Sequence, residues 1–364
     1  MEVHVLIKSL LKLVLLSLML VAILSLAGCE GQPTESWPGL GMDGDTLYVS
    51  LGAKVHALDR ETGAQSWAFP ADESQTGQMF HAPAVQSPAG QVFVGSFKDR
   101  LFAFEAPGRD LWSFPTKGAI VGGATVMDDV VYVGCNDRNV YALSAADGTL
   151  QWAFGTESWN WASPVYEDGD VYVASMDHRV YRLDATDGTE KWRFEAEGAV
   201  ADSPVLADGK VIFGDFDRQV HALDAASGAE IWSVATDQWV WGSPAYDDGL
   251  VFVADLSGKV YALNPATGDK LWEFKAGGPV RAGLIARNGV VYALSQNGVG
   301  YALDAKQGTE IRRFSPGDPQ LAGRFLSDPV LADDVLYVVS EKGFVYAFLT
   351  TDGTTKWVFN PTSD

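Results

Sequence analysis

Short apolar runs alternate with polar turns along most of the chain, and the stretch 161–194 shows the pattern clearly. Within it, the runs 171–173 and 180–183 are β-branched and aromatic with a period of two, which is typical of half-buried strands. A shorter run opens at Pro164 and a last one covers 191–194, with Asp-, Ser- and Gly-rich turns between the runs. The pattern predicts four antiparallel strands, A to D, in about 40 residues, which leaves no room for a crossover helix.

This unit recurs eight times, and each copy carries a turn glycine followed four residues later by a large side chain. The spacing is 40 residues from the second copy to the seventh and 45 at the first and last gaps. A fixed period of this length indicates a repeat architecture, and radial closure would remove the exposed sheet edges. We therefore predict an all-β fold, an eight-bladed β-propeller of four-stranded antiparallel blades over residues 37–364. A seven-bladed ring with one stray repeat and an open solenoid are the alternatives, and the pattern leaves open how the ends close the ring.

The repeat motif, Y-x-L-D-x-x-x-G-x-x-x-W-x-F at 181–194, resembles the pyrroloquinoline-quinone (PQQ) type propeller repeat. The resemblance covers roughly residues 37–360 and differs from the WD40 pattern of Gly-His and Trp-Asp pairs. It implies a tryptophan that docks each blade on its neighbour. A tryptophan recurring at one strand position is structural, a large ring wedged between blades with one N–H to satisfy. Seven residues hold this position: Trp67, Trp112, Trp152, Trp192, Trp232, Trp272 and Trp357.

The amino terminus carries a second pattern. Lys8 and Lys12 precede the apolar run 13–27, which ends in Leu-Ala-Gly-Cys at Cys29. A basic start, a short apolar stretch and small residues before a cleavage site describe a secretory signal. The ending resembles the bacterial lipobox, so we predict that residues 1–28 are a lipoprotein signal peptide and that Cys29 is lipidated. A plain signal peptide with an incidental cysteine, or an uncleaved anchor, is the alternative.

The segment after this cysteine is short. Residues 29–36 would form a lipidated tether, and its seven residues from Glu30 to Ser36 reach roughly 25 Å when fully extended. The propeller would therefore stay close to the membrane. Glu30 directly after the cysteine resembles an outer-membrane sorting signal, which predicts the periplasmic side of the outer membrane in a cell with two membranes. In a cell with one membrane, the outer face of the plasma membrane is expected.

The composition disfavours some classes of binding partner. The net charge is −21, and removing residues 1–28 leaves 24 basic and 46 acidic residues, a net charge of −22. This acidity argues against nucleic acid and against flat contact with anionic lipid. Once Cys29 is lipidated, Cys135 is the only remaining thiol, so no internal disulfide is possible and stability has to come from burial.

The charge is distributed unevenly between the turns. In a propeller the A–B and C–D turns share one face, which here is predicted to be acidic because of pairs such as Asp128-Asp129 and Asp247-Asp248. The B–C and D–A turns share the other face, which we call the mixed face. Five successive B–C turns are basic, at Lys98 and Arg100, Arg138, Arg179, Arg218 and Lys259. They would form either a partner surface or ion pairs between blades.

Four tryptophans that the repeat does not require lie in D–A connections and hence on the mixed face. Their equivalents in other blades are small, and Arg281 and Trp37 align with two of them. Such residues suit a protein, peptide or sugar contact. The predicted protein-interaction face consists of Trp159, Trp161, Arg179, Arg218, Trp239, Trp241 and Arg281. In the alternative reading, Trp161 and Trp241 only plug the central channel.

The sequence offers little support for catalysis. The resemblance to PQQ repeats suggests PQQ-dependent dehydrogenase activity as a candidate. Enzymes of that kind have adjacent cysteines, a Ca²⁺ site and a catalytic aspartate. The mature chain has one free thiol, so it lacks the pair of adjacent cysteines. His56 and His221 occupy the tyrosine position of strand C, while His81 and His178 are isolated and lack metal-ligand spacing. We therefore predict no catalytic residue, no metal and no cofactor, with PQQ and Ca²⁺ as the alternative.

A lipobox followed by a PQQ-type propeller without cofactor machinery resembles the BamB family, scaffold lipoproteins of the outer-membrane β-barrel assembly machine. The resemblance implies a non-enzymatic, monomeric ring anchored to the membrane by lipid and bound to an envelope or outer-membrane protein complex, without nucleic acid. No loop motif allows contact residues to be carried over. A PQQ-dependent dehydrogenase and an envelope sugar- or peptide-binding receptor are the alternative functions.

Overall fold

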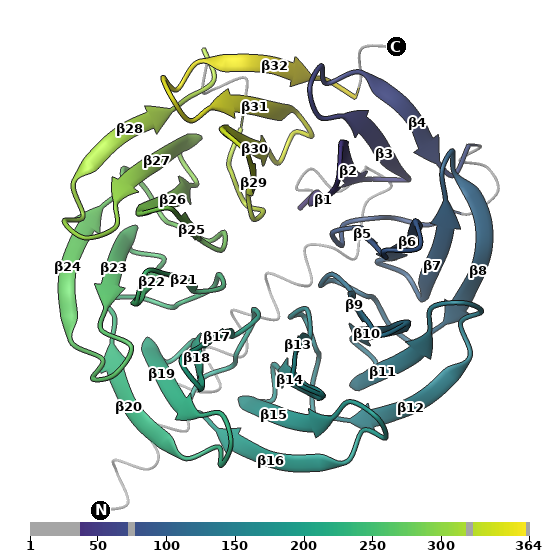
Figure 1. The fold of residues 1–364 in the computed structure, drawn as a ribbon, viewed down its shortest axis with the longest axis horizontal. Coiled ribbons are helices and arrows are strands. Elements are labelled where there is room, and N and C mark those ends of the chain that lie inside the picture. Colours follow the sequence, from purple (N-terminus) through teal and green to yellow (C-terminus); the bar gives the residue numbers. More distant parts are fainter. Residues whose placement is uncertain (1–36, 72–76, 318–322, 362–364) are drawn as a thin grey trace, which may run out of the picture. The chain divides into compact units, whose positions relative to one another are not determined.

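The computed structural model describes residues 37–71, 77–317 and 323–361. The predicted signal peptide, the tether and Cys29 lie outside the described residues. Residues Trp37–Asp364 form one compact unit. Its described part contains strands and turns but no helix, and therefore no helix able to span a bilayer. Eight four-stranded antiparallel sheets are arranged as blades around a centre (Figure 1), which confirms the predicted fold class.

Within every blade the strand order follows the chain, from an innermost strand A to an outermost strand D (Figure 1). Blades 1 to 4 consist of β1 (Gly39–Asp43), β2 (Thr46–Leu51), β3 (Lys54–Asp59) and β4 (Gln65–Phe69); β5 (Val85–Gln86), β6 (Gln91–Gly95), β7 (Arg100–Glu105) and β8 (Arg109–Pro115); β9 (Thr125–Met127), β10 (Val130–Gly134), β11 (Asn139–Ser144) and β12 (Leu150–Gly155); and β13 (Val165–Glu167), β14 (Asp170–Ala174), β15 (Arg179–Asp184) and β16 (Glu190–Glu195).

Blades 5 to 8 repeat the arrangement. They consist of β17 (Val205–Ala207), β18 (Lys210–Gly214), β19 (Gln219–Asp224) and β20 (Glu230–Ala235); β21 (Ala245–Asp247), β22 (Leu250–Ala254), β23 (Lys259–Leu263) and β24 (Lys270–Lys275); β25 (Ile285–Arg287), β26 (Val290–Ser295), β27 (Val299–Asp304) and β28 (Glu310–Phe314); and β29 (Val330–Ala332), β30 (Val335–Val339), β31 (Val345–Leu349) and β32 (Thr355–Phe359).

Burial explains the sequence pattern of each strand type. The second strand of a blade is covered on both faces, and β14 is buried at every position, which accounts for its continuous apolar run. The outermost strand β16 alternates, and Trp192 is its buried residue. All eight pairings between strands C and D contain a register shift at the same place, which in blade 4 lies between Arg182 and Leu183.

The tryptophan on strand D docks on the next blade. In blade 4 the Trp192 indole N–H donates to the Ala225 carbonyl at 3.0 Å. A Cβ placed on Gly228, which has a φ of +72°, would lie 2.6 Å from Cδ2 of this ring, so the turn glycine is needed for its conformation and for the close approach. The same bond joins five further pairs: Trp112 to Ala145, Trp152 to Ala185, Trp232 to Pro265, Trp272 to Ala305 and Trp357 to Arg60. Trp67 packs edge-on against Phe104, with ring centroids 5.9 Å apart.

The ring closes without sharing a strand, because every blade is built from consecutive strands. The indole of Trp357 in blade 8 donates to the Arg60 carbonyl of blade 1 at 3.0 Å, and Tyr337 donates its hydroxyl to the same oxygen at 3.1 Å. The Arg60 guanidinium pairs with Asp333 at 3.0 Å. The docking contact that joins neighbouring blades elsewhere therefore also joins the two ends.

Blade 7 is the exception, because Arg312 occupies the tryptophan position. Its Cδ would lie 3.0 Å from a Cβ on Gly353, so the side chain follows the path of the missing indole. The Arg312 Nε is buried and has no hydrogen-bond partner among the described residues. This junction thus leaves a buried donor unsatisfied, whereas six of the other junctions satisfy one.

We predict that Arg312→Trp stabilises the protein by about 1–2 kcal/mol, because the indole would bury its ring on Gly353 and gain a carbonyl acceptor from Thr350, which holds the position of Ala305. Denaturant unfolding would measure the gain. Arg312→Leu serves as the control, since it removes the charge without supplying the N–H donor. A free energy of unfolding for Arg312→Trp at or below that of Arg312→Leu would contradict the docking account.

Candidate interaction face at the mouth of the ring

Hydrogen bonds assign the turns to two faces. The Ala185 N–H of a C–D turn donates to the Gly169 carbonyl of an A–B turn at 2.9 Å, so these turns lie together on the acidic face. The Glu157 N–H of a D–A loop donates to Asp177 of a B–C turn at 2.9 Å, which places these on the mixed face. The predicted division of the turns between two faces is therefore the arrangement in the structure.

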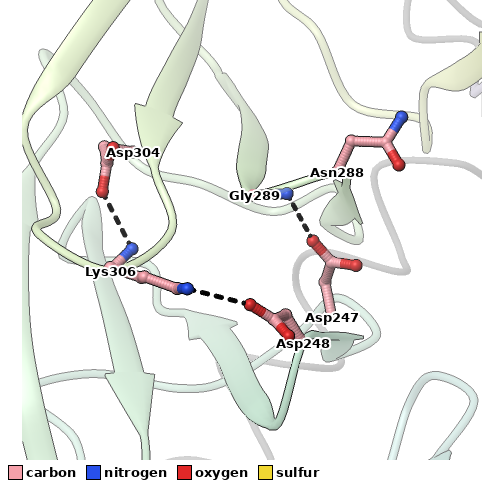
Figure 2. Close-up of a pocket in the computed structure, with 6 residues that line it drawn as sticks. All are labelled: Asp247, Asp248, Asn288, Gly289, Asp304 and Lys306. Atoms are coloured by element: carbon pink, nitrogen blue, oxygen red, sulfur yellow. Dashed lines mark hydrogen bonds and ion pairs between the residues drawn. The ribbon is translucent and has the colours of Figure 1, made fainter.

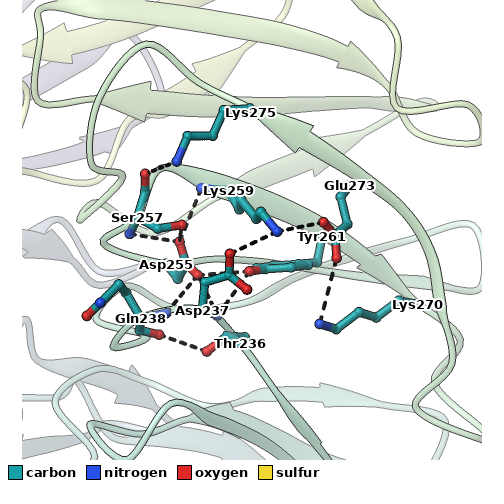
Figure 3. Close-up of polar contacts among 10 residues, drawn as sticks. All are labelled: Thr236, Asp237, Gln238, Asp255, Ser257, Lys259, Tyr261, Lys270, Glu273 and Lys275. Carbon is teal, nitrogen blue, oxygen red and sulfur yellow. Dashed lines mark hydrogen bonds and ion pairs between the residues drawn. The ribbon is translucent and has the colours of Figure 1, made fainter.

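A carboxylate in the B–C turn fastens the loop that carries Trp239. Asp255 is fully buried and accepts hydrogen bonds from the Tyr261 hydroxyl at 2.9 Å and from the backbone N–H groups of Asp237 and Gln238 at 3.1 Å each (Figure 3). The same side chain also caps its own turn through the backbone of Ser257 and Lys259. The D–A loop before Trp239 is therefore held by a buried charge with several donors.

In blade 5 a histidine replaces the tyrosine of this network. The His221 Nε2 lies 3.3 Å from Asp215 Oδ2, and its Nδ1 lies 2.8 Å from Glu230 Oε1. Burial disfavours the protonated imidazole and lowers the pKa of His221. The hydrogen bonds and negative charges of Asp215 and Glu230 outweigh this effect, so the pKa of His221 is raised overall. His221 is therefore a part of the turn network rather than a metal ligand.

Four of the predicted residues form a stack at the mouth. The rings of Trp159 and Trp161 are stacked with centroids 5.8 Å apart, and those of Trp161 and Trp241 lie 6.2 Å apart. The Arg281 guanidinium carbon lies 4.2 Å from the Trp241 centroid and 4.2 Å from that of Trp37, so the cation is held between two rings. We call these five residues the mouth stack.

The mouth stack crosses the centre of the ring. Trp37, Trp161, Trp241 and Arg281 hold the same repeat position, shortly before strand A of blades 1, 4, 6 and 7. Blades 4 and 6 are not neighbours, and neither are blades 7 and 1. Contacts between their side chains therefore pass over the innermost ends of the blades. This is the position that the alternative prediction, a plug of the central channel, gives to Trp161 and Trp241.

Phe216 joins Trp239 to the mouth stack, and sequence reasoning missed it. Its ring stacks on Trp239 at 5.2 Å and lies 4.9 Å from Trp241. Phe216 belongs to the B–C turn of blade 5. The only hint in the sequence is that the same turn of blade 2 also holds an aromatic residue, Phe97, which is 40% exposed.

Two further carboxylates line the channel. Asp202 accepts from the N–H groups of Ser203 at 2.8 Å and Ser243 at 3.0 Å, and Asp328 accepts from the N–H of Gly283 at 2.5 Å. Desolvation by neighbouring protein atoms and the charge of Asp328 raise the pKa of Asp202 to about 7. Desolvation also raises the pKa of Asp328, although its side chain is exposed to solvent and that of Asp202 is half-buried. Sequence reasoning did not select them, because turns rich in aspartate occur in every blade.

The predicted basic residues Arg179 and Arg218 differ in exposure and in ion pairing. Arg179 is 15% exposed and pairs with Glu195 of its own blade at 3.5 Å and with Glu157, in the loop that leads into this blade, at 2.9 Å. Arg218 is exposed and forms no ion pair within the described part of the chain. The structure thus brings Trp159, Trp161, Trp239, Trp241 and Arg281 together, whereas Arg179 and Arg218 lie in B–C turns outside the mouth stack.

The acidic face holds a pocket of about 600 Å³ between blades 6 and 7. It is lined by Asp247, Asp248, Asn288, Gly289, Asp304 and Lys306 (Figure 2). Lys306 pairs with Asp248 at 3.1 Å, and Asp247 accepts from the Gly289 N–H at 2.7 Å. Its polar groups satisfy one another, so we take the mixed face as the candidate site.

A quinone with a metal ion does not fit the residues at the centre. The mouth stack fills the position over the channel, and the Asp202 and Asp328 carboxylates accept from backbone N–H groups. Among residues 37–71, 77–317 and 323–361, no group of three or more His, Cys, Asp or Glu could hold a metal ion. We therefore derive no chemical step through such a group.

Comparisons with known proteins give the same family as the repeat motif. The family model of the outer membrane protein assembly factor BamB matches residues 31–113, 53–158, 156–237, 216–315 and 318–364. The chain is similar to the outer membrane protein assembly factor BamB of Nitrosomonas eutropha, with 26% identity over 107 residues, which are 29% of this chain and 25% of that protein. The match thus spans about a quarter of that relative's length.

Two solved structures share the fold. BamB from Moraxella catarrhalis has a TM-score of 0.72 at 18% identity, covering 84% of this chain and 94% of its own. A europium-containing methanol dehydrogenase has a TM-score of 0.69 at 15% identity, covering 85% and 82%. At these identities the likeness concerns the fold alone.

The His221 network predicts a pH dependence. Because the folded-state pKa is raised, the charged ring stabilises the fold fully below about pH 6.5 and this contribution is lost as the pH rises through the folded value. In His221→Tyr, the hydroxyl would replace the ring as Tyr261 does in blade 6, without titrating in this range. We expect unfolding free energies from pH 6 to 9 to fall in the wild type relative to His221→Tyr. Parallel curves would show that His221 carries no such charge.

Proposed function

The chain belongs to the family of the outer membrane protein assembly factor BamB, and on this premise we propose that it is a non-enzymatic scaffold for outer-membrane protein assembly. The observation that carries the proposal is the family match, which extends from residue 31 to residue 364 and so includes all eight blades. In a repeat scaffold, function resides in the residues that differ from the repeat pattern. In this chain such residues, the mouth stack with Phe216 and Trp239, lie together at the mouth of the ring.

The scaffold is held at the envelope by lipid on Cys29. Acyl chains anchor by burying methylenes at roughly 0.8 kcal/mol each, so a multiply acylated cysteine holds stably. The location is the periplasmic side of the outer membrane, which the family and the Glu30 position both support. The partner is an envelope or outer-membrane protein complex.

The contact surface consists of the mouth stack together with Phe216 and Trp239. Tryptophan and arginine are enriched among the residues that dominate binding energy at protein interfaces. Here they are already stacked on one another, so little side-chain entropy is left to lose on binding. Trp159 is 38% exposed at the outer end of the stack and offers a free edge to a partner.

A quinoprotein oxidoreductase is the second candidate, favoured by the structural likeness to a europium-containing methanol dehydrogenase. It would require a metal and a quinone at a centre whose residues fit neither. A sugar- or peptide-binding receptor is a third candidate that would use the same exposed aromatic rings.

We predict that Trp159→Ala combined with Trp239→Ala lowers recovery of the partner from solubilised envelope membranes at least tenfold, because two aromatic anchors each contribute about 2 kcal/mol or more. Affinity purification at matched bait levels would measure it. Leu271→Ala, which removes a 51% exposed side chain from an outermost strand, is the matched control. Equal recovery by the double variant and the control would remove the mouth from the contact surface.

A further inference from the structure

The A–B turn of blade 7 differs from its counterparts by one amide. Asn288-Gly289 joins β25 to β26, with Arg287 opposite Val290, and the two turn residues have φ values of +55° and +78°. This is the two-residue hairpin turn in which both residues need a positive φ. Three other blades form the same turn with an Asp-Gly pair: Asp168-Gly169, Asp208-Gly209 and Asp248-Gly249. Asn288 therefore carries an amide where these blades carry a carboxylate.

An asparagine followed by a glycine is open to attack by its own backbone. The glycine nitrogen can bond to the side-chain carbonyl carbon and close a five-membered ring, because glycine has no Cβ to hinder the approach. There is room for such a ring at Gly289, since a Cβ built on it would meet no atom within 4 Å beyond its chain neighbours. The Asn288 side chain is exposed at the acidic-face pocket, and no hydrogen bond within the described residues holds its amide (Figure 2). Water therefore reaches this amide.

A contact from the neighbouring blade restrains the attacking nitrogen. The Gly289 N–H donates to Asp247 of blade 6 at 2.7 Å (Figure 2). The nitrogen attacks only after it has lost its proton. A carboxylate that accepts the hydrogen bond of this N–H makes the loss harder, because it places a negative charge beside the nitrogen. The reaction at Asn288 therefore requires the Asp247 contact to open.

The second Asn-Gly pair of the chain provides an internal comparison. Asn297-Gly298 lies in the B–C turn of blade 7. The Asn297 Oδ1 accepts from the Val299 N–H at 3.2 Å, and the Gly298 N–H donates to the Ser295 carbonyl at 3.0 Å. Gly298 is also buried. Both reacting groups are therefore engaged by the turn itself, and the nitrogen is shielded from solvent.

We propose that Asn288 is a site of spontaneous deamidation. The Gly289 nitrogen loses its proton to water and bonds to the Asn288 Cγ, and ammonia leaves as the bond from Cγ to the amide nitrogen breaks. A second water then opens the ring, which gives aspartate when it attacks Cγ and isoaspartate when it attacks the main-chain carbonyl carbon. In the balance, amide and water become carboxylic acid and ammonia, and nothing is oxidised or reduced.

The repeat shows that the fold accepts the aspartate product. Aspartate holds the equivalent position in blades 4, 5 and 6, at φ values between +47° and +50°. The product adds a negative charge to a pocket that is lined by three aspartates and one lysine. Deamidation therefore makes the acidic face more acidic, and it gives blade 7 the carboxylate that blade 6 carries by sequence.

Peptide mapping by mass spectrometry of the purified, folded chain, incubated at mildly alkaline pH, tests the site. We expect conversion of Asn288 to exceed that of Asn297 at least fivefold, because only Asn297 has both reacting groups held by hydrogen bonds. The same chain unfolded in urea is the control, since the two pairs have nearly the same neighbours in sequence and should then react alike. Equal conversion in the folded chain, or faster conversion of Asn297, would overturn the proposal.

Asp247→Ala tests the restraint on the nitrogen. Without the acceptor of the Gly289 N–H, the rate at Asn288 should rise about fivefold while that at Asn297 stays unchanged, as the loss of one hydrogen bond implies. Asp247→Asn keeps an acceptor without the charge, so its rate should lie between those of the wild type and Asp247→Ala. An unchanged or lower rate at Asn288 in both variants would contradict the role of Asp247. None of these measurements involves a partner, so their failure leaves the proposed scaffold function untouched.

Discussion

The bond between a strand-D indole and a carbonyl of the next blade is the contact on which the rest of the structure depends. A single blade buries only part of its apolar surface, and packing on the next blade covers the remainder. At this junction the indole ring lies on a turn glycine, and its N–H donates to a carbonyl oxygen of the next blade. The contact recurs at the same place at six of the eight junctions between blades. The final example, Trp357 on blade 1, turns the row of blades into a ring without exchanging a strand.

Closure determines what lies at the centre. Eight innermost strands begin around one axis, so side chains just before them meet across it although they are far apart in sequence. Trp161, Trp241, Arg281 and Trp37 fill this position, and buried carboxylates such as Asp255 hold the adjoining loops. The result is a rigid aromatic and cationic surface, fixed before any partner arrives. Such a surface suits recognition, which gains from preorganisation, more than it suits a reaction that needs an open cavity.

The blades could be predicted from the sequence because each depends on local order: turn glycines, period-two runs and one tryptophan per 40 residues. The loops that carry Trp159 and Trp239 could be predicted for the same reason, as departures from a regular repeat. The cation held between Trp241 and Trp37 could not, because these residues come from non-adjacent blades and meet only after closure. Phe216 and Asp202 were missed likewise, since their importance comes from neighbours across the mouth rather than from their own turns.

The central claim is that the centre of this ring is filled for recognition and not shaped for a cofactor. The most direct measurement adds PQQ with Ca²⁺ or Eu³⁺ to the purified protein and follows alcohol- or sugar-dependent reduction of a dye. The account predicts no reduction above that of the free cofactor and metal. Saturable, substrate-dependent turnover that is lost in Asp202→Asn would contradict it.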